Sequence, residues 1–139
     1  MPPHLIFLDT SFIIALENRD DPRHTRAKLV GRELTASHPV FVLHWGVLFE
    51  IGDGYARLGR RAKGLELFER FQHEEGYEVQ PINEPLFEEA LALYRARHDK
   101  EWGLTDCVSF VLMRRLGISD ALTADEHFRQ AGFSALLLD

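Results

Sequence analysis

Short apolar runs alternate with longer segments of helical periodicity along the 139 residues, and this alternation constrains the fold more than any other feature. Most of the runs are hydrophobic throughout, which is typical of strands buried on both faces of a parallel sheet. Strands are expected at Leu5–Leu8, Pro39–Leu43, Tyr77–Gln80, Ser119–Leu122 and Ala135–Leu138. Strands that alternate with helices predict an α/β fold, with a central parallel sheet of about five strands flanked by helices.

The segments between these runs carry apolar residues at helical spacing. Helices are expected at Ser11–Glu17, Pro22–Thr35, His44–Leu58 and Arg60–His73, after a cap at Asn83 or Glu84, and around His127 and Phe128. Another helix is expected to begin with Thr105 as its N-cap and to end at Gly117. The sequence shows no repeat, low-complexity segment or linker, so residues 1–139 are expected to form one domain.

Composition and charge narrow the class of protein. The single cysteine, Cys107, cannot form an internal disulfide, and the apolar stretch Leu5–Leu16 is too short to span a bilayer. It also lacks the basic flank of a signal peptide, so we expect a cytoplasmic protein without membrane association. The net charge of −6 argues against broad electrostatic coating of nucleic acid. It is compatible with an enzyme that contacts phosphates through metal ions.

Four acidic residues lie in unusually apolar surroundings: Asp9, Glu50, Asp106 and Asp125. Each has a structural explanation when taken alone, because Asp9 and Asp125 could cap helices, Asp106 could complement a helix dipole and Glu50 could point to water. In the expected architecture, however, Asp9 and Asp125 follow strands and Asp106 begins a helix at the same sheet edge. Carboxylates gathered in one crevice repel one another, so they either take up protons or bind a cation, and an all-oxygen site suits Mg²⁺ or Mn²⁺.

Four segments around these acids resemble the PIN domain, in particular the toxin ribonucleases of bacterial VapBC-type toxin–antitoxin pairs. They are Leu8-Asp9-Thr10-Ser11, Glu50 within an apolar helix, Leu104-Thr105-Asp106-Cys107-Val108-Ser109-Phe110, and Ala121-Leu122-Thr123-Ala124-Asp125-Glu126-His127-Phe128 followed by Ala131-Gly132-Phe133. The resemblance covers nearly the whole chain in order, and its third and fourth segments are the most specific.

The resemblance implies a single PIN domain over residues 1–139 and an endoribonuclease activity that depends on Mg²⁺ or Mn²⁺. The family's acidic quartet falls on Asp9, Glu50, Asp106 and Asp125, of which Asp9, Asp106 and Asp125 would hold the metal. Polar helper residues would fall on Thr10 or Ser11 in the first segment and on Thr123 in the fourth. The resemblance also implies an RNA substrate, a homodimer and a small antitoxin partner that covers the active site.

Other candidate residues carry weaker signals. The histidines form no zinc-binding pattern, and His127 is expected to be a packing residue. Cys107 is expected in the core, and Trp45 and Trp102 in the core or an interface. A basic cluster could guide RNA phosphates or could simply be a solvated face; it comprises Arg57, Arg60, Arg61 and Lys63.

Two other functions remain as alternatives. Another metal-dependent phosphohydrolase, such as one of the haloacid-dehalogenase type, also begins with a strand that ends in aspartate. That type needs a second aspartate at the position of Ser11, and a phosphate-binding GxxxxGK[ST] loop is absent from the sequence. The second alternative is a catalytically inactive PIN-like scaffold that binds RNA or protein, which the retention of all four acids disfavours.

Overall fold

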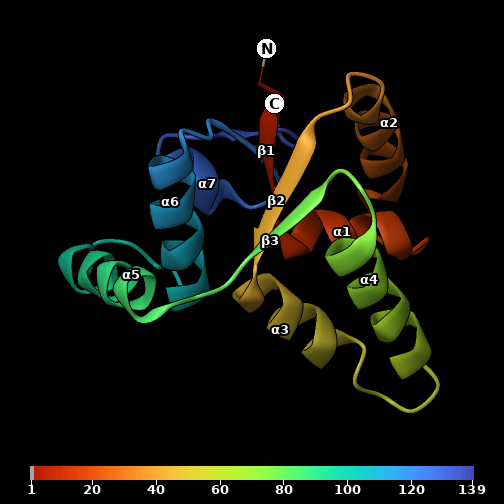
Figure 1. The fold of residues 1–139 in the computed structure, drawn as a ribbon, viewed down its shortest axis with the longest axis horizontal. Coiled ribbons are helices and arrows are strands. Elements are labelled where there is room, and N and C mark those ends of the chain that lie inside the picture. The colour runs from red at the N-terminus through yellow and green to blue at the C-terminus, as the bar shows by residue number, and fades with distance from the viewer. Residues whose placement is uncertain (1) are drawn as a thin grey trace.

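A computed structural model describes residues 2–139, and its centre is a five-stranded parallel sheet (Figure 1). The strands are β1 (Leu5–Leu8), β2 (Val40–His44), β3 (Tyr77–Gln80), β4 (Asp120–Leu122) and β5 (Ser134–Ala135). They are arranged in the order β3-β2-β1-β4-β5, and every neighbouring pair is parallel. The predicted α/β fold with about five parallel strands is therefore confirmed.

Seven helices connect and flank the strands of the described chain. They are α1 (Thr10–Glu17), α2 (His24–Thr35), α3 (Trp45–Gly54), α4 (Arg61–His73), α5 (Glu84–Ala96), α6 (Leu104–Leu116) and α7 (Glu126–Gln130). Figure 1 shows α1, α2 and α4 on one side of the sheet and α5, α6 and α7 on the other. Among residues 2–139, no helix has the length and apolar character needed to cross a membrane.

Several predicted boundaries differ from the structure, and three differences have a clear physical cause. The helix expected to reach Leu58 ends at Gly54, where glycine residues weaken the last turn and Tyr55 leaves the helical conformation. Gly103, rather than Thr105, is the N-cap of α6, because the Asp106 carboxylate accepts the backbone N–H of Gly103 at 3.0 Å. The last strand stops at Ala135, whose carbonyl accepts the N–H groups of residues 138 and 139 and so closes a turn.

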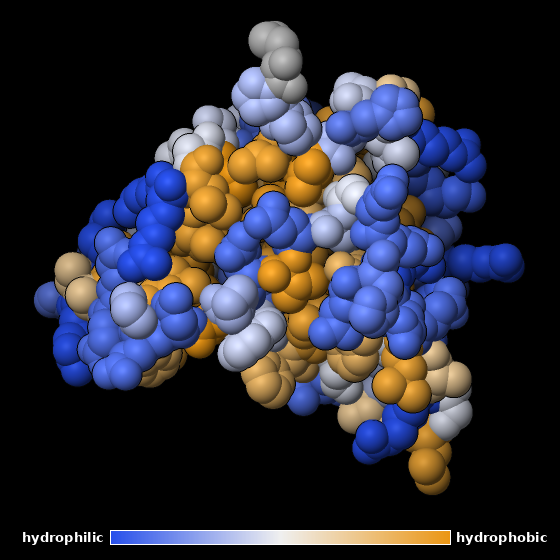
Figure 2. Space-filling model, in the orientation of Figure 1, coloured by the Kyte–Doolittle hydropathy of each residue, from blue (hydrophilic) through white to orange (hydrophobic). Residues whose placement is uncertain are grey.

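The core lies on both faces of the sheet, as the uninterrupted apolar strands require. Ile6 and Phe7 of β1 alternate between the two faces and are both fully buried. On one face, Phe7 stacks on Phe128 of α7, which meets Phe110 of α6 edge to face at 5.0 Å between ring centroids. Figure 2 shows hydrophilic residues over the outer surfaces of α4 and α5, with hydrophobic residues visible between them. This packing fixes the carboxyl ends of β1, β2 and β4 at one edge of the molecule.

Candidate active site

The candidate site is built at the carboxyl ends of β1 and β4, the neighbouring strands at the middle of the sheet. Asp9 follows β1 directly, and its backbone N–H donates to the carbonyl of Leu122 at 3.3 Å. Thr123 and Asp125 follow β4 in the same way. Functional crevices of parallel sheets lie at this edge, because the loops after the strands diverge there.

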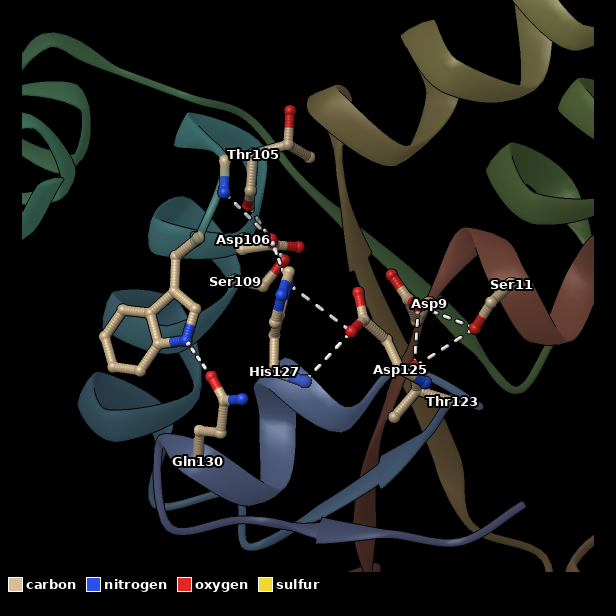
Figure 3. A network of polar contacts seen from close by, with 11 residues as sticks. Asp9, Ser11, Thr105, Asp106, Ser109, Thr123, Asp125, His127 and Gln130 are labelled. Atoms are coloured by element: carbon tan, nitrogen blue, oxygen red, sulfur yellow. Dashed lines mark hydrogen bonds and ion pairs between the residues drawn. The ribbon is translucent and has the colours of Figure 1, made fainter. Parts of the chain in front are cut away.

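The Asp9 carboxylate is held by two hydroxyl groups (Figure 3). Its Oδ2 accepts hydrogen bonds from Thr123 Oγ1 at 2.7 Å and from Ser11 Oγ at 2.8 Å. The Ser11 hydroxyl in turn accepts the backbone N–H of Ala124 at 3.0 Å, which ties the start of α1 to the loop after β4. Oδ1 of Asp9 makes no hydrogen bond within residues 2–139 and is not sealed from solvent. The side chain is thus fixed in orientation with one oxygen left open.

Burial raises the pKa of the Asp9 carboxyl to about 6. The hydrogen bonds from Thr123 and Ser11 act in the opposite direction, since they favour the ionised form. The negative charges of Glu50 and Asp106 raise the pKa further, which shows that these carboxylates lie within electrostatic reach of Asp9. An ionised Asp9 is therefore costly in the folded protein, and a cation would relieve that cost.

Asp106, Asp125 and His127 form a compact group beside Asp9 (Figure 3). Nδ1 of His127 lies 3.1 Å from Asp106 Oδ2 and 3.4 Å from Asp125 Oδ1. One potential ligand atom from each of the three residues lies within 4.8 Å of the others. Asp125 also caps α7, since its Oδ1 accepts the backbone N–H of His127 at 2.9 Å. The structural and functional interpretations of Asp125 are thus compatible.

Glu50 approaches the site from α3. Its Oε1 accepts a 2.6 Å hydrogen bond from Thr10 Oγ1, and Thr10 is the residue after Asp9. The four predicted acids are therefore arranged as two neighbouring sets. Asp106 and Asp125 belong to the compact group with a histidine, whereas Asp9 and Glu50 are joined through the first turn of α1.

The site is acidic, and its four carboxylates have no lysine or arginine partner among the described residues. Among residues 2–139, no lysine or arginine forms an ion pair with Asp9, Glu50, Asp106 or Asp125. Carboxylate oxygens with one imidazole nitrogen make a donor set that fits a divalent cation. The residues present therefore fit the metal ion expected from the sequence.

A buried polar network, which the sequence pattern did not indicate, connects β2 to the start of α6. His44 is fully buried, and its Nδ1 accepts the backbone N–H of Gly46 at 2.9 Å. Nε2 must then carry the proton, and it donates to Ser109 Oγ at 2.9 Å, while that hydroxyl donates to the Thr105 carbonyl. Burial lowers the pKa of His44 to about 4, so the ring is neutral at pH 7. The network fixes the first turn of α6 and hence Asp106.

The expectation that His127 is only a packing residue is wrong, because its ring turns toward two carboxylates. The sequence signal was its place two residues after Asp125 at a helix start.

Cys107 is fully buried, and burial, followed by the charge of Asp106, raises the pKa of its thiol, in agreement with a core role. Trp102 is buried and donates to Gln130 at 2.9 Å.

The basic cluster divides in two. Lys63 pairs with Glu17 at 3.4 Å and with Glu66 at 3.5 Å. Arg57, Arg60 and Arg61 are exposed in the connection from α3 to α4 and at the start of α4, and none of them forms an ion pair within the described residues. These three arginines are available for an anionic partner.

Three comparisons with known proteins agree with the fold described above. The family model for the PIN domain matches residues 6–134. The chain is 33% identical over 132 residues to the 23S rRNA-specific endonuclease VapC20 of Mycobacterium tuberculosis, covering 93% of this chain and 95% of that protein. The crystal structure of M. tuberculosis VapC20, described as a sarcin–ricin loop cleaving toxin, is similar with a TM-score of 0.80 and 31% identity, covering 92% of this chain and 95% of the other.

A second solved structure, FitAcB from Neisseria gonorrhoeae, shares the fold with a TM-score of 0.61 and 20% identity, covering 94% of this chain and 95% of the other. The family match spans most of the chain, and the identity to VapC20 extends over nearly its full length. The family predicted from the sequence is confirmed: this chain belongs to the PIN-domain family.

Proposed function

We propose that this protein is a divalent-metal-dependent endoribonuclease that acts as the toxin of a toxin–antitoxin pair. The observation that carries the proposal is the gathering of Asp9, Glu50, Asp106 and Asp125 at one sheet edge, with no lysine or arginine paired to them among residues 2–139. The similarity to a 23S rRNA-specific endonuclease supports it and makes 23S rRNA, with its sarcin–ricin loop, the first substrate to test.

Asp9, Asp106 and Asp125 would hold the cation, which would be Mg²⁺ or Mn²⁺. When bound, such a cation lowers the pKa of water and offsets the negative charge that develops on a phosphodiester in the transition state. Within the chain, Ser11 and Thr123 orient Asp9 and leave its Oδ1 directed to the open side. Preorganised ligands of this kind lose little entropy when the site is filled.

Glu50 has a different role in the proposal. Its side chain lies on the exposed surface of α3, and Thr10 holds one of its oxygens beside Asp9. A carboxylate in this position can accept the proton of an attacking water. The Thr10 hydroxyl thus acts as a positioning group for Glu50.

Arg57, Arg60 and Arg61 are proposed to contact RNA phosphates, because they are exposed and unpaired within the described residues. Cleavage should therefore weaken as salt increases.

We also propose that residues 1–139 form one PIN domain and that the protein acts in the cytoplasm. A homodimer and a small antitoxin are the proposed protein partners, and exposed aromatic residues such as Phe49 are compatible with such contacts.

The test is cleavage of an RNA fragment that contains the sarcin–ricin loop by purified protein free of any partner, with Mg²⁺, Mn²⁺ or EDTA. Asp106→Asn keeps the shape of the side chain and should abolish cleavage while the protein stays folded. Asp99→Asn is the matched control, because Asp99 is exposed, bonds to Arg97 and lies outside the acidic groups. Metal-dependent cleavage that survives in a folded Asp106→Asn variant would refute the assignment. Binding of RNA without cleavage or metal binding would favour the scaffold alternative.

A further inference from the structure

We infer that His127 is a nitrogen ligand of the proposed metal site and that it makes the site prefer a first-row transition ion such as Mn²⁺ over Mg²⁺. The inference rests on the proposed function, because it concerns the same site. It adds a nitrogen ligand to the acidic quartet and assigns a preference for Mn²⁺ over Mg²⁺ that carboxylates alone would not impose.

The distances around Nδ1 of His127 are those of neighbouring ligands on one ion. Ligand atoms about 2.1 Å from an octahedral cation lie roughly 3.0 Å apart when adjacent and about 4.2 Å apart when opposite. Nδ1 lies 3.1 Å from Asp106 Oδ2 and 3.4 Å from Asp125 Oδ1. One potential ligand atom from each of the three residues lies within 4.8 Å of the other two. The three residues can therefore each offer one ligand atom to one cation.

The backbone holds His127 in place from both sides. Its N–H donates to Asp125 Oδ1 at 2.9 Å in the cap of α7. The next residue, Phe128, is fully buried and packs against Phe7 and Phe110. The His127 side chain is 28% exposed, so solvent and ions can reach it. A partly exposed imidazole that is fixed against two carboxylates fits a ligand better than a packing residue.

The nitrogen decides which ion is preferred. Mg²⁺ is bound almost entirely by oxygen and sheds its water reluctantly. First-row transition ions accept imidazole as well as carboxylate. Replacing one oxygen position by Nδ1 should therefore favour Mn²⁺ over Mg²⁺ at this site.

The experiment uses Mn²⁺ alone as the probe, added to the full chain without RNA. Electron spin-echo envelope modulation detects nitrogen nuclei bound to Mn²⁺, and it requires no catalysis. We expect nitrogen coupling in the wild type, its loss in His127→Ala, and its retention in His98→Ala, a matched control because His98 is exposed. Competition with Mg²⁺ should show that the preference for Mn²⁺ falls at least about tenfold in His127→Ala.

Each alternative result has a distinct meaning. Mn²⁺ that binds to the wild type without nitrogen coupling would overturn this inference and leave the proposed function intact. Coupling that persists in a His127→Ala variant with a native circular dichroism spectrum would also overturn it, since another nitrogen would be the ligand. Failure of the wild type to bind Mn²⁺ or Mg²⁺ would overturn both the inference and the proposed function. The wild-type spectrum alone shows whether a nitrogen atom is bound to Mn²⁺, even if a variant fails to fold.

Discussion

Replacing Asp9 by asparagine should stabilise the protein near neutral pH although the same change removes a proposed metal ligand. The asparagine carbonyl oxygen can still accept the hydrogen bonds that Ser11 and Thr123 donate to Oδ2. What disappears is a carboxylate whose pKa is raised by burial and by the charges of Glu50 and Asp106. At pH 7 the wild type must keep this unfavourable charge in the folded state, whereas the variant carries none.

The size of the effect follows from the shift in pKa. The pKa of Asp9 rises from 3.8 to about 6, and at 1.36 kcal/mol per unit this shift corresponds to about 3 kcal/mol. Since the pKa is raised, the stability linked to Asp9 protonation is fully present below pH 3.8 and is lost as the pH rises through 6. The free energy of unfolding of Asp9→Asn, minus that of the wild type, should therefore grow by about 3 kcal/mol between pH 3.8 and neutrality.

The assay is urea unfolding followed by circular dichroism at a series of pH values in EDTA. EDTA is needed because a bound cation would stabilise only the wild type. Other titrating groups are common to both proteins, so the difference between the two curves reports Asp9. A difference that stays constant across the pH series would refute the argument that burial and neighbouring charges act on this carboxyl.

Three further predictions use the same unfolding measurement or the RNA cleavage assay. Comparison of the wild type with His44→Gln should show the opposite pH dependence, because the pKa of His44 is lowered from 6.5 to about 4. The contribution of His44 to the free energy of unfolding is fully present above pH 6.5 and falls by about 3 kcal/mol as the pH drops through 4. A wild type whose stability relative to this variant is independent of pH would contradict that sign. Gly46→Ala should cost about 1–3 kcal/mol, because the new Cβ would lie 2.7 Å from His44 Cε1, whereas Gly54→Ala meets nothing within 4 Å and serves as the control. Thr10→Val should slow RNA cleavage without lowering the melting temperature, because it removes the 2.6 Å hydrogen bond to Glu50; equal cleavage rates would argue against a positioning role.

The sheet could be predicted because its strands are marked by short apolar runs that a buried parallel strand requires. Leu5–Leu8 and Tyr77–Gln80 form strands with the predicted bounds. The end of the final strand was mispredicted, because an apolar run such as Ala135–Leu138 has the same sequence pattern in a strand and in a buried turn. The turn depends on the Ala135 carbonyl and on the Asp139 side chain, which accepts the Ala135 N–H at 2.9 Å.

The candidate site was predictable where a charged residue interrupts an apolar segment, as Asp9 and Asp106 do. His127 was misjudged because its place two residues after Asp125 is a weak signal, which does not show where the ring points. Its role depends on which way α7 turns after the Asp125 cap and on how close α6 lies. The His44–Ser109 contact joins residues 65 positions apart and could not be foreseen from local pattern.

The bond between Thr123 and Asp9 joins residues separated by 114 positions, and this separation bears on how the protein is made. A ribosome releases Asp9 early in synthesis, whereas the loop that orients its carboxylate emerges late. Until β4 has paired with β1, the nascent chain has neither the hydroxyl of Thr123 nor the group formed by Asp106, Asp125 and His127. We expect partial chains to be inert as nucleases, so that a ribosome translating this message would not be exposed to the activity proposed for the finished enzyme.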